Sequence, residues 1–328
     1  MSIHPMWDNF PAIKNDLAQS YHIIEKKIRI RNKDVEATLY DLLHSGGKFL
    51  RPAYAILFSR FGNPSKQDHK KILATAASVE ILHMATLIHD DVIDESPTRR
   101  GTETVQAKYG KDIAVYTGDF LFTVYFDLLA DIGESQKTLK LNAFAMKRIL
   151  LGELDQMYLC YNTNVTVRQY LRRVNGKTAQ LFSLSCFEGA KHGKADLAVI
   201  AASQQIGRQI GIAFQILDDI LDYTVDSDTM KKPVLEDVKQ GVYSLPLILA
   251  MHNHQAEFEP FLNKKEQMTA TDIEAVLALI KQYRGVEQAQ ALAERYTNKA
   301  LKRIEHLPNK PEKEILMTIT KKLLNRSY

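Results

Sequence analysis

The chain has 328 residues, of which 45% are hydrophobic and 25% charged, an ordinary globular composition that excludes a disordered or fibrous protein. Lys and Arg number 43 against 39 Asp and Glu, so the net charge is +4, and no basic tail indicates nucleic acid binding. The low content of turn formers, 15 glycines and 10 prolines, favours long helices over many short strands.

The two cysteines, Cys160 and Cys186, lie within apolar helical patterns. This placement indicates buried thiols in a reduced, cytoplasmic protein, and not a disulfide framework or a zinc site. The first residues lack the basic segment and apolar run of a signal peptide. No stretch approaches the about 18 uncharged apolar residues of a membrane span.

Helical periodicity recurs along the chain and predicts an all-α protein with about ten or more helices. The apolar pattern predicts a largely buried helix from Ile72 to Ile93. Thr271–Glu274 has the spacing of a capping box that opens a helix through Ile280. Other helices are predicted for Ala198 to Tyr223, for Val286 to Ile304, and after Pro308 and Pro311 as far as Leu324.

Clusters of Gly, Pro and polar residues predict the loops. These are residues 45–47, 131–136, 161–165 and 189–196, with an irregular or partly helical segment at 224–244. No repeat, low-complexity tract or linker divides the chain, so we expect one domain over residues 1–328.

Two identical DDxxD strings, each embedded in Ile, Leu and Val, are the strongest feature. Their six carboxylates are Asp90, Asp91, Asp94, Asp218, Asp219 and Asp222. In a helix, residues four apart differ by about 40° around the axis, so the first and last aspartates of each string share a face.

Carboxylates crowded in this way repel one another, and burying them without counter-charge is costly. Mg²⁺ relieves the repulsion, since it binds one or two carboxylates together with substrate phosphate oxygens. A single acidic string could equally be a solvated helix surface. Two strings flanked by apolar residues favour two acidic walls with a metal–diphosphate cluster between them.

Basic residues surround the two strings in the sequence. They are Lys48, Arg51, Arg99, Arg100, Lys177 and Lys232. Arginine forks and lysine ammonium groups commonly bind phosphate, although any one of these residues alone would be read as a surface charge. His83 precedes Asp90 by seven residues and lies within roughly 20° of it on the helix, which supports a place in the same site.

These motifs resemble those of the trans-polyprenyl diphosphate synthases, a family of all-helical class I isoprenoid synthases. From Gly46 to about Leu249, the family's order and spacing are reproduced by GGKFLRP, HDDVIDESPTRRG, YTGD, GKTA, FQILDDILD and SLP. The segments YTGDFLF, Gly152–Gln156 and YLRRVNGKTAQLFSLSC are most similar to the large catalytic subunit (component II) of heptaprenyl diphosphate synthase. The resemblance implies a helical bundle around a deep central cavity.

The resemblance also implies a role for each matching residue. Asp90 and Asp94 match Mg²⁺ ligands with Asp91 in support, and Asp218 matches the principal ligand of the second string, with Asp219 and Asp222 nearby. The positions that hold isopentenyl diphosphate match Lys48, Arg51, His83 and Arg100. Those around the allylic diphosphate match Arg99, Lys177, Thr178, Gln215 and Lys232. The expected catalytic residues are therefore Asp90, Asp94, Asp218, Arg99 and Lys177.

The residues offer no G-x-S-x-G elbow and no persuasive nucleophile–base pair. The family's reaction requires neither. Magnesium and basic residues stabilise charge as the allylic C–O bond breaks, the double bond of isopentenyl diphosphate attacks, and a proton is lost, with the departing diphosphate as the base.

The product is expected to grow from Asp90 toward the N-terminus of its own helix, past Ala85 and Thr86 to Leu82, about 12 Å away. Short-chain members of the family carry bulky aromatic residues just before the first string. Ala85 and Thr86 are small, which predicts a product of roughly C30 to C50. Alternatively, the small residues only allow close helix packing, or a floor is formed by Phe120, Phe122, Tyr125 and Phe126.

Two segments depart from the family pattern. Glu103 stands where the family has proline, and Lys231–Asp237 lacks both glycines of the usual G-K-P-x-G-x-D. Because glycine allows positive φ and a close approach to a ligand, these losses predict an altered backbone near Lys232.

Several alternatives remain open from the sequence. The chain could be a catalytic subunit that is inactive without a small partner, or a geranylgeranyl diphosphate synthase. A terpene cyclase is disfavoured, because cyclases lack the set Lys48, Arg51 and Arg100. The expected partners are isopentenyl diphosphate, an allylic diphosphate such as farnesyl diphosphate, and a second subunit in a homodimer or a heterodimer with a small regulatory protein. No nucleic acid is expected, and at most peripheral membrane association.

Overall fold

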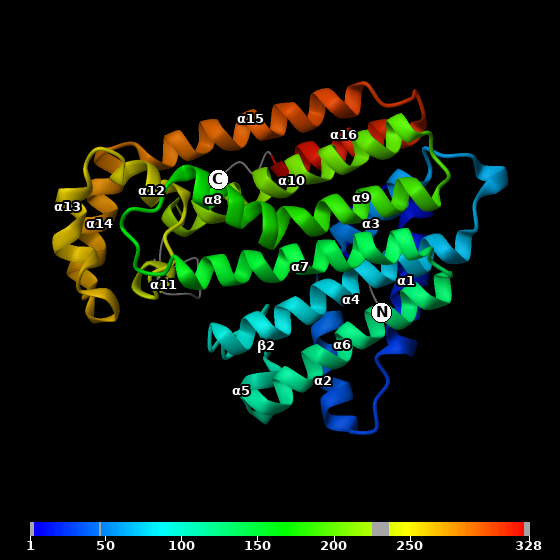
Figure 1. Ribbon diagram of the computed structural model, residues 1–328, viewed down its shortest axis with the longest axis horizontal. Helices are drawn as coiled ribbons and strands as arrows, with labels where there is room; N and C mark the ends of the chain where they lie inside the picture. The colour runs from blue at the N-terminus through cyan, green and yellow to red at the C-terminus, as the bar shows by residue number, and fades with distance from the viewer. Residues whose placement is uncertain (1–2, 46, 225–235, 325–328) are drawn as a thin grey trace. The chain divides into compact units, whose positions relative to one another are not determined.

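The computed structural model describes residues 3–45, 47–224 and 236–324. The described chain is almost entirely helical, as predicted (Figure 1). Strands β1 (Thr98–Arg99) and β2 (Thr102–Glu103) form one short antiparallel hairpin, in which Thr98 pairs with Glu103.

The helices of the first half, in chain order, are η1 (Pro5–Trp7), α1 (Pro11–Lys27), α2 (Lys33–His44), α3 (Leu50–Ser59), η2 (Pro64–Lys66), α4 (His69–Ile93), α5 (Val105–Tyr109), α6 (Lys111–Ile132) and α7 (Gln136–Tyr158). They are followed by α8 (Val167–Val174), η3 (Asn175–Ala179), α9 (Gln180–His192), α10 (Leu197–Thr224), α11 (Glu236–Lys239), α12 (Leu245–Met251), α13 (Gln255–Leu262), η4 (Lys265–Gln267), α14 (Ala270–Gln282), α15 (Gly285–Glu305) and α16 (Pro311–Leu324).

The contacts divide the chain into two compact units. Unit 1 comprises Met1–Ala143 and Leu184–Gln204, and unit 2 comprises Phe144–Ser183 and Gln205–Tyr328. The boundaries fall within α7, α9 and α10 and not within linkers.

Unit 1 is organised around α4, which packs against α1, α3 and above all α6 (Figure 1). The α4 helix begins at Asp68, whose side chain accepts hydrogen bonds from the amides of Lys70 and Lys71. Apolar residues cover most of its circumference, and most of them are buried, so α4 is the core helix of unit 1.

Unit 2 contains the long helix α15, which packs against α12 and α16 (Figure 1). Small residues, Ala289, Ala293, Thr297 and Ala300, lie on the buried face of α15 at three-to-four spacing. This face brings the backbones of neighbouring helices close together.

The predicted helices that were longest and most periodic are confirmed. The helix from Ile72 to Ile93 lies within α4, that from Ala198 to Tyr223 within α10, and that from Val286 to Ile304 within α15. The final helix, α16, extends to Leu324, the last described residue. The prediction of buried thiols holds for Cys186, which is fully buried, whereas Cys160 is only half-buried.

Two local predictions were wrong. The capping box of α14 is formed by Thr269 and Asp272, two residues before the predicted Thr271: Thr269 Oγ1 accepts from the Asp272 amide, and Asp272 accepts from the Thr269 amide. Gly189 lies inside α9 and not in a turn. A Cβ at this position would lie 2.1 Å from the Ala55 carbonyl oxygen, so the glycine serves a close helix contact.

The predicted irregular segment 224–244 includes the short helix α11 and otherwise lies partly outside the described residues. Among the described helices, α4 and α6 have the length and mean hydropathy of membrane spans, which the sequence analysis had not anticipated. The corresponding window of α4 is 72% buried and that of α6 is 44% buried. The largely buried window of α4 is typical of a helix in a protein core.

Candidate active site

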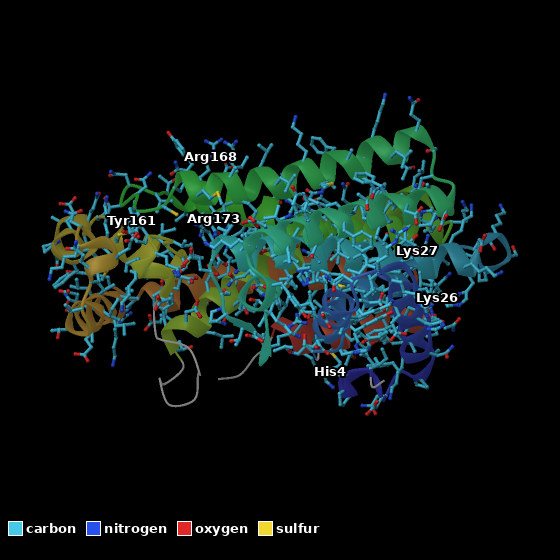
Figure 2. All side chains as sticks on the ribbon, turned by 90° about the horizontal axis from the view of Figure 1, so that it is seen from below. His4, Lys26, Lys27, Tyr161, Arg168 and Arg173 are labelled. Atoms are coloured by element: carbon cyan, nitrogen blue, oxygen red, sulfur yellow. The ribbon has the colours of Figure 1, made fainter. Side chains whose placement is uncertain are left out.

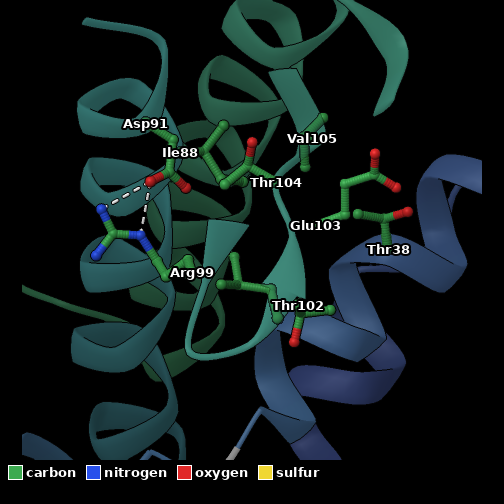
Figure 3. A pocket seen from close by; sticks show the side chains of 9 residues that line it. Thr38, Ile88, Asp91, Arg99, Thr102, Glu103, Thr104 and Val105 are labelled. Atoms are coloured by element: carbon green, nitrogen blue, oxygen red, sulfur yellow. Dashed lines mark hydrogen bonds and ion pairs between the residues drawn. The ribbon is translucent and has the colours of Figure 1, made fainter. Parts of the chain in front are cut away.

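The first aspartate string lies at the end of α4, and its second aspartate, Asp91, is buried. Asp91 is 4% exposed, and both Nε and Nη2 of Arg99 lie 2.7 Å from its Oδ1 atom (Figure 3). Burial raises the pKa of Asp91, although the charge of Arg99 opposes this shift. Asp91 thus anchors the β1–β2 hairpin to the end of α4.

Asp90 and Asp94 lie on a different side of the helix end. Asp90 is half-buried, and Asp94, the C-cap residue of α4, is exposed. Adjacent helical residues are rotated by about 100°, and residues four apart by about 40°, which explains why Asp91 is separated from this pair. Asp90 and Asp94 are therefore the less buried carboxylates of this string.

A small cavity of about 10 Å³, room for about one water molecule, lies beside the Asp91–Arg99 ion pair (Figure 3). Its lining comes from α2, the end of α4 and the hairpin, and includes Thr38, Ile88 and Glu103. It is too small for a diphosphate. Glu103, which replaces the family's proline, is an exposed lining residue here.

Cationic side chains of unit 1 gather around Glu80 and His83 on α4. Arg51 lies in the first turn of α3, and Arg100 follows β1 with a φ of 52°. A Cβ on Gly47 would lie 2.7 Å from Nη1 of Arg100, so a larger residue here would require this guanidinium to shift. The carbonyl of the exposed Lys48 accepts a hydrogen bond from Nε1 of the fully buried Trp7 at 2.8 Å, which fixes this segment.

His83 belongs to the same group of residues. Burial, together with the charges of Arg51, Arg100 and Arg99, holds the pKa of His83 well below its usual value, so its imidazole is neutral at pH 7. A neutral imidazole can donate one hydrogen bond to an anion without adding charge.

Glu80 is a member of this group that the sequence analysis missed. It is 7% exposed on α4 and interacts electrostatically with Arg51 and Arg100. Burial raises its pKa, and the two arginines oppose that shift. The sequence offered one indication of its role: Glu80 stands among apolar residues, three positions before His83.

The second aspartate string lies in the last turns of α10, in unit 2. Asp219 is 8% exposed, whereas Asp218 is exposed and Asp222 half-buried. The Asp219 carboxylate accepts a hydrogen bond from Tyr170 Oη at 2.6 Å and one from Gln215 Nε2 at 2.8 Å. Burial raises the pKa of Asp219 to about 6, and these hydrogen bonds oppose the increase. The middle aspartate of this string is thus an inward anchor too.

Lys177 and Thr178 lie in η3, a π-helical turn between α8 and α9. Such turns occur frequently at functional sites. Lys177 Nζ lies 2.7 Å from Oε2 of Glu153 on α7, and Thr178 Oγ1 donates to Gln215 Oε1 at 2.6 Å. Unit 2 therefore brings Lys177, Thr178 and Gln215 near one another, and adds Glu153 as a partner that had no predicted role. Lys232 lies outside the described residues.

The residues expected along the product path occupy different environments. Ala85 and Leu82 are fully buried, and Thr86 is half-buried with its hydroxyl donating to the His83 carbonyl. Of the aromatic residues on α6, Phe122 stacks on His89, and Tyr125 is fully buried. Phe126, in contrast, is 40% exposed.

A separate acidic group in unit 1 consists of Glu134, Glu188 and His192, whose ligand atoms lie within 4.8 Å of one another. His192 Nε2 lies 2.6 Å from Glu134 Oε1, and Lys191 Nζ lies 2.9 Å from the other oxygen of Glu134. The two basic side chains already neutralise the carboxylates, so this group is a structural ion-pair network.

Comparison with known proteins gives consistent matches over most of the chain. The family described as polyprenyl synthetase matches residues 32–281. The chain is 35% identical over 293 residues to heptaprenyl diphosphate synthase component 2 of Bacillus subtilis, covering 89% of this chain and 82% of that protein. It is 34% identical to octaprenyl diphosphate synthase of Escherichia coli, with 85% of each chain covered. Among solved structures, geranylgeranyl pyrophosphate synthase from Lactobacillus brevis superposes with a TM-score of 0.94 at 45% identity, covering 98% of this chain and 99% of that one.

Proposed function

The chain belongs to the polyprenyl synthetase family and is a prenyltransferase, and from that premise we propose that it extends an allylic diphosphate with isopentenyl diphosphate. The observation that carries the proposal is the cationic group of unit 1. Arg51 and Arg100 interact electrostatically with neutral His83 on α4, about two helical turns before Asp90. This arrangement suits the binding of isopentenyl diphosphate next to an allylic diphosphate that is held by metal ions.

Arg51, Arg100, Lys48 and His83 are proposed to bind the diphosphate of isopentenyl diphosphate. Guanidinium forks match phosphate oxygens in geometry, and a neutral histidine donates without extra repulsion between cations. Glu80, buried among the arginines, offsets part of their charge when no diphosphate is bound.

Asp90 and Asp94 fit Mg²⁺ as ligands, because they are outward-facing carboxylates on one helix face and Mg²⁺ accepts one or two such groups with phosphate oxygens. Asp218 and Asp222 are proposed as the corresponding ligands on α10. When bound, Mg²⁺ neutralises charge that develops on the leaving diphosphate.

Arg99, Lys177, Thr178, Gln215 and Lys232 are proposed to surround the allylic diphosphate. Lys177 supplies positive charge to the leaving group, and its ion pair with Glu153 holds the ammonium group in place between turnovers. No protein side chain is assigned as the base, because the departing diphosphate itself can accept the proton.

The product is proposed to be a polyprenyl diphosphate of roughly C30 to C50, since Ala85 and Thr86 leave the start of the path without a bulky side chain. A second candidate is a geranylgeranyl product, favoured by the similarity to the Lactobacillus brevis enzyme. Full burial of Ala85 also agrees with the view that its small size serves helix packing.

The enzyme is proposed to act as a dimer. The unit 2 part of α7 exposes Phe144, Leu151, Leu154 and Tyr158 at helical spacing, an apolar stripe suited to a second copy of this chain. The similarity to a protein named component 2 favours, as an alternative, activity only with a different partner.

Unit boundaries inside helices support one polyprenyl synthase domain over residues 1–328. A cytoplasmic enzyme, at most peripherally associated with membranes, fits an apolar product.

The proposal is tested by incubating the purified chain with labelled isopentenyl diphosphate, farnesyl diphosphate and Mg²⁺, and sizing the products by chromatography. Products of roughly C30 to C50 that disappear with EDTA are expected. Products that end at about C20 would support the second candidate. Absence of any product at every magnesium concentration, with the folded chain alone and with candidate partner proteins, would contradict the proposed activity.

A further inference from the structure

Tyr170 connects α8 to the second aspartate string from inside unit 2. Its side chain is fully buried, and its Oη atom donates to Asp219 Oδ2 at 2.6 Å. The other oxygen, Oδ1, accepts from Gln215 Nε2 at 2.8 Å, and Gln215 in turn accepts from Thr178. Both oxygens of Asp219 are therefore bound by donors from the protein interior.

Tyr170 is itself held in place by its own helix. The guanidinium of Arg173 lies 5.4 Å from the centre of the Tyr170 ring and donates to the Tyr243 carbonyl at 3.0 Å. Arg173 is buried, whereas Arg168 at the start of α8 is exposed (Figure 2). The donor that reaches Asp219 is thus supported by a cation–π contact and a backbone hydrogen bond.

The position of Asp219 sets the direction of its neighbours on α10. Asp218 is rotated by about 100° from Asp219, and Asp222 follows Asp218 by one helical turn. A hydrogen bond that fixes Asp219 toward the interior therefore fixes the rotation of this helix end, and with it the outward direction of Asp218 and Asp222.

We propose that Tyr170 is a positioning residue that holds the second aspartate string in its metal-binding orientation through Asp219, which is an anchor and not a metal ligand. The inference rests on the proposed function for the identity of the metal and substrate. Outer residues that orient metal ligands typically contribute about 10- to 100-fold in metal affinity.

Tyr125 provides a matched control in unit 1. It is also fully buried, and its Oη atom donates to Asn142 Oδ1 at 2.6 Å. Removing either hydroxyl deletes one short buried hydrogen bond, but only Tyr170 contacts an aspartate string.

The test is a Mn²⁺ titration followed by electron paramagnetic resonance, with an unreactive thiolo analogue of farnesyl diphosphate and no turnover. Tyr170→Phe is expected to raise the Mn²⁺ Kd about 10-fold, and Tyr125→Phe to leave it within about 2-fold of wild type. In Mg²⁺-dependent turnover, Tyr170→Phe should shift the half-saturating Mg²⁺ concentration by a similar factor. An unchanged Kd for Tyr170→Phe, or equal increases for both variants, would overturn the proposal.

Asp219→Asn provides a second test if Tyr170→Phe does not fold. Asparagine keeps an oxygen that accepts from Tyr170, so its Mn²⁺ Kd should rise less than about 10-fold, against about 100-fold or more for Asp218→Asn. Equal losses would make Asp219 a ligand and overturn the proposal. Failure of the proposed function would look different, because wild type itself would then bind no Mn²⁺ with the analogue.

Discussion

Arg99 Nε donates a hydrogen bond to Asp91 Oδ1 at 2.7 Å, and Nη2 of the same guanidinium lies 2.7 Å from that oxygen in an ion pair. This ion pair turns the second aspartate of the first string toward the hairpin, and Tyr170 does the same for Asp219 in the second string. In each DDxxD string the second aspartate is buried and accepts a hydrogen bond from another side chain, and the first and last aspartates are half-buried or exposed. The sequence motif alone does not distinguish these two roles.

Arg99→Lys is expected to lower kcat/KM for the allylic substrate about 10-fold, because a lysine ammonium cannot reproduce the contact that two guanidinium nitrogens make with Asp91 Oδ1. The measurement is steady-state kinetics with varied farnesyl diphosphate. Asp91→Asn should cost a similar factor, and the double variant should be no worse than either single variant. Losses that multiply in the double variant would show that Arg99 acts on the allylic diphosphate independently of Asp91.

Gly47→Ala is expected to raise the KM for isopentenyl diphosphate about 10-fold, equivalent to about 1.4 kcal/mol, with kcat little changed. The added Cβ would lie 2.7 Å from Arg100 Nη1 and displace that guanidinium. Ser45→Ala, in the same segment, is the control, since the Ser45 hydroxyl donates only to the Leu42 carbonyl. A normal KM for isopentenyl diphosphate in Gly47→Ala would contradict the proposal that Arg100 binds this substrate.

Much of this could be predicted from the sequence, and the exceptions have physical reasons. Helices α4 and α10 were predicted to within a few residues because long apolar periodicity decides them. The cap of α14 was misplaced because Thr269 and Thr271 each have an acidic residue three positions later, so two overlapping frames fit the motif.

The aspartates and basic residues of the candidate site were also found from the sequence, because they occur in ordered motifs. Glu80, Glu153 and Tyr170 were not assigned roles, since each acts through contacts with other elements. A single glutamate or tyrosine in an apolar helix carries no local signal of its tertiary partner.

Thr86→Phe is expected to shorten the product, because a phenyl ring one turn before Asp90 narrows the proposed hydrocarbon path. The product distribution is measured by liquid chromatography and mass spectrometry. Thr271→Phe adds the same bulk at an exposed position on α14 and should leave the distribution unchanged. An unaltered product from a folded, active Thr86→Phe enzyme would place the path elsewhere.

His192→Gln is expected to cost about 3 kcal/mol of unfolding free energy at neutral pH, as is typical when one partner of a buried ion pair is removed. Burial lowers the pKa of His192, but hydrogen bonds to Glu134 and Glu188 outweigh this effect and leave the pKa raised. The stabilisation is therefore fully present below about pH 6.5 and is lost as the pH rises through the raised pKa.

Urea unfolding of wild type and His192→Gln across this pH range measures the effect. The difference between the two proteins should shrink as the pH rises. Tyr125→Phe removes a hydrogen bond to Asn142, which in turn donates to Glu188. Because this change removes no charged group, its cost in unfolding free energy should not vary with pH. A difference between wild type and His192→Gln that stays constant with pH would contradict a charged His192 in the native protein.

The central claim, that the outward carboxylate of the first string supports metal-dependent prenyl transfer, is tested most directly by Mg²⁺-dependent incorporation of labelled isopentenyl diphosphate in Asp90→Ala. Glu95→Gln is the control, because Glu95 lies at the same helix end, is exposed, and pairs with Lys111 on the surface. The account predicts a loss of about 10³-fold in kcat for Asp90→Ala and near-normal turnover for Glu95→Gln. Full Mg²⁺-dependent activity in Asp90→Ala would contradict it.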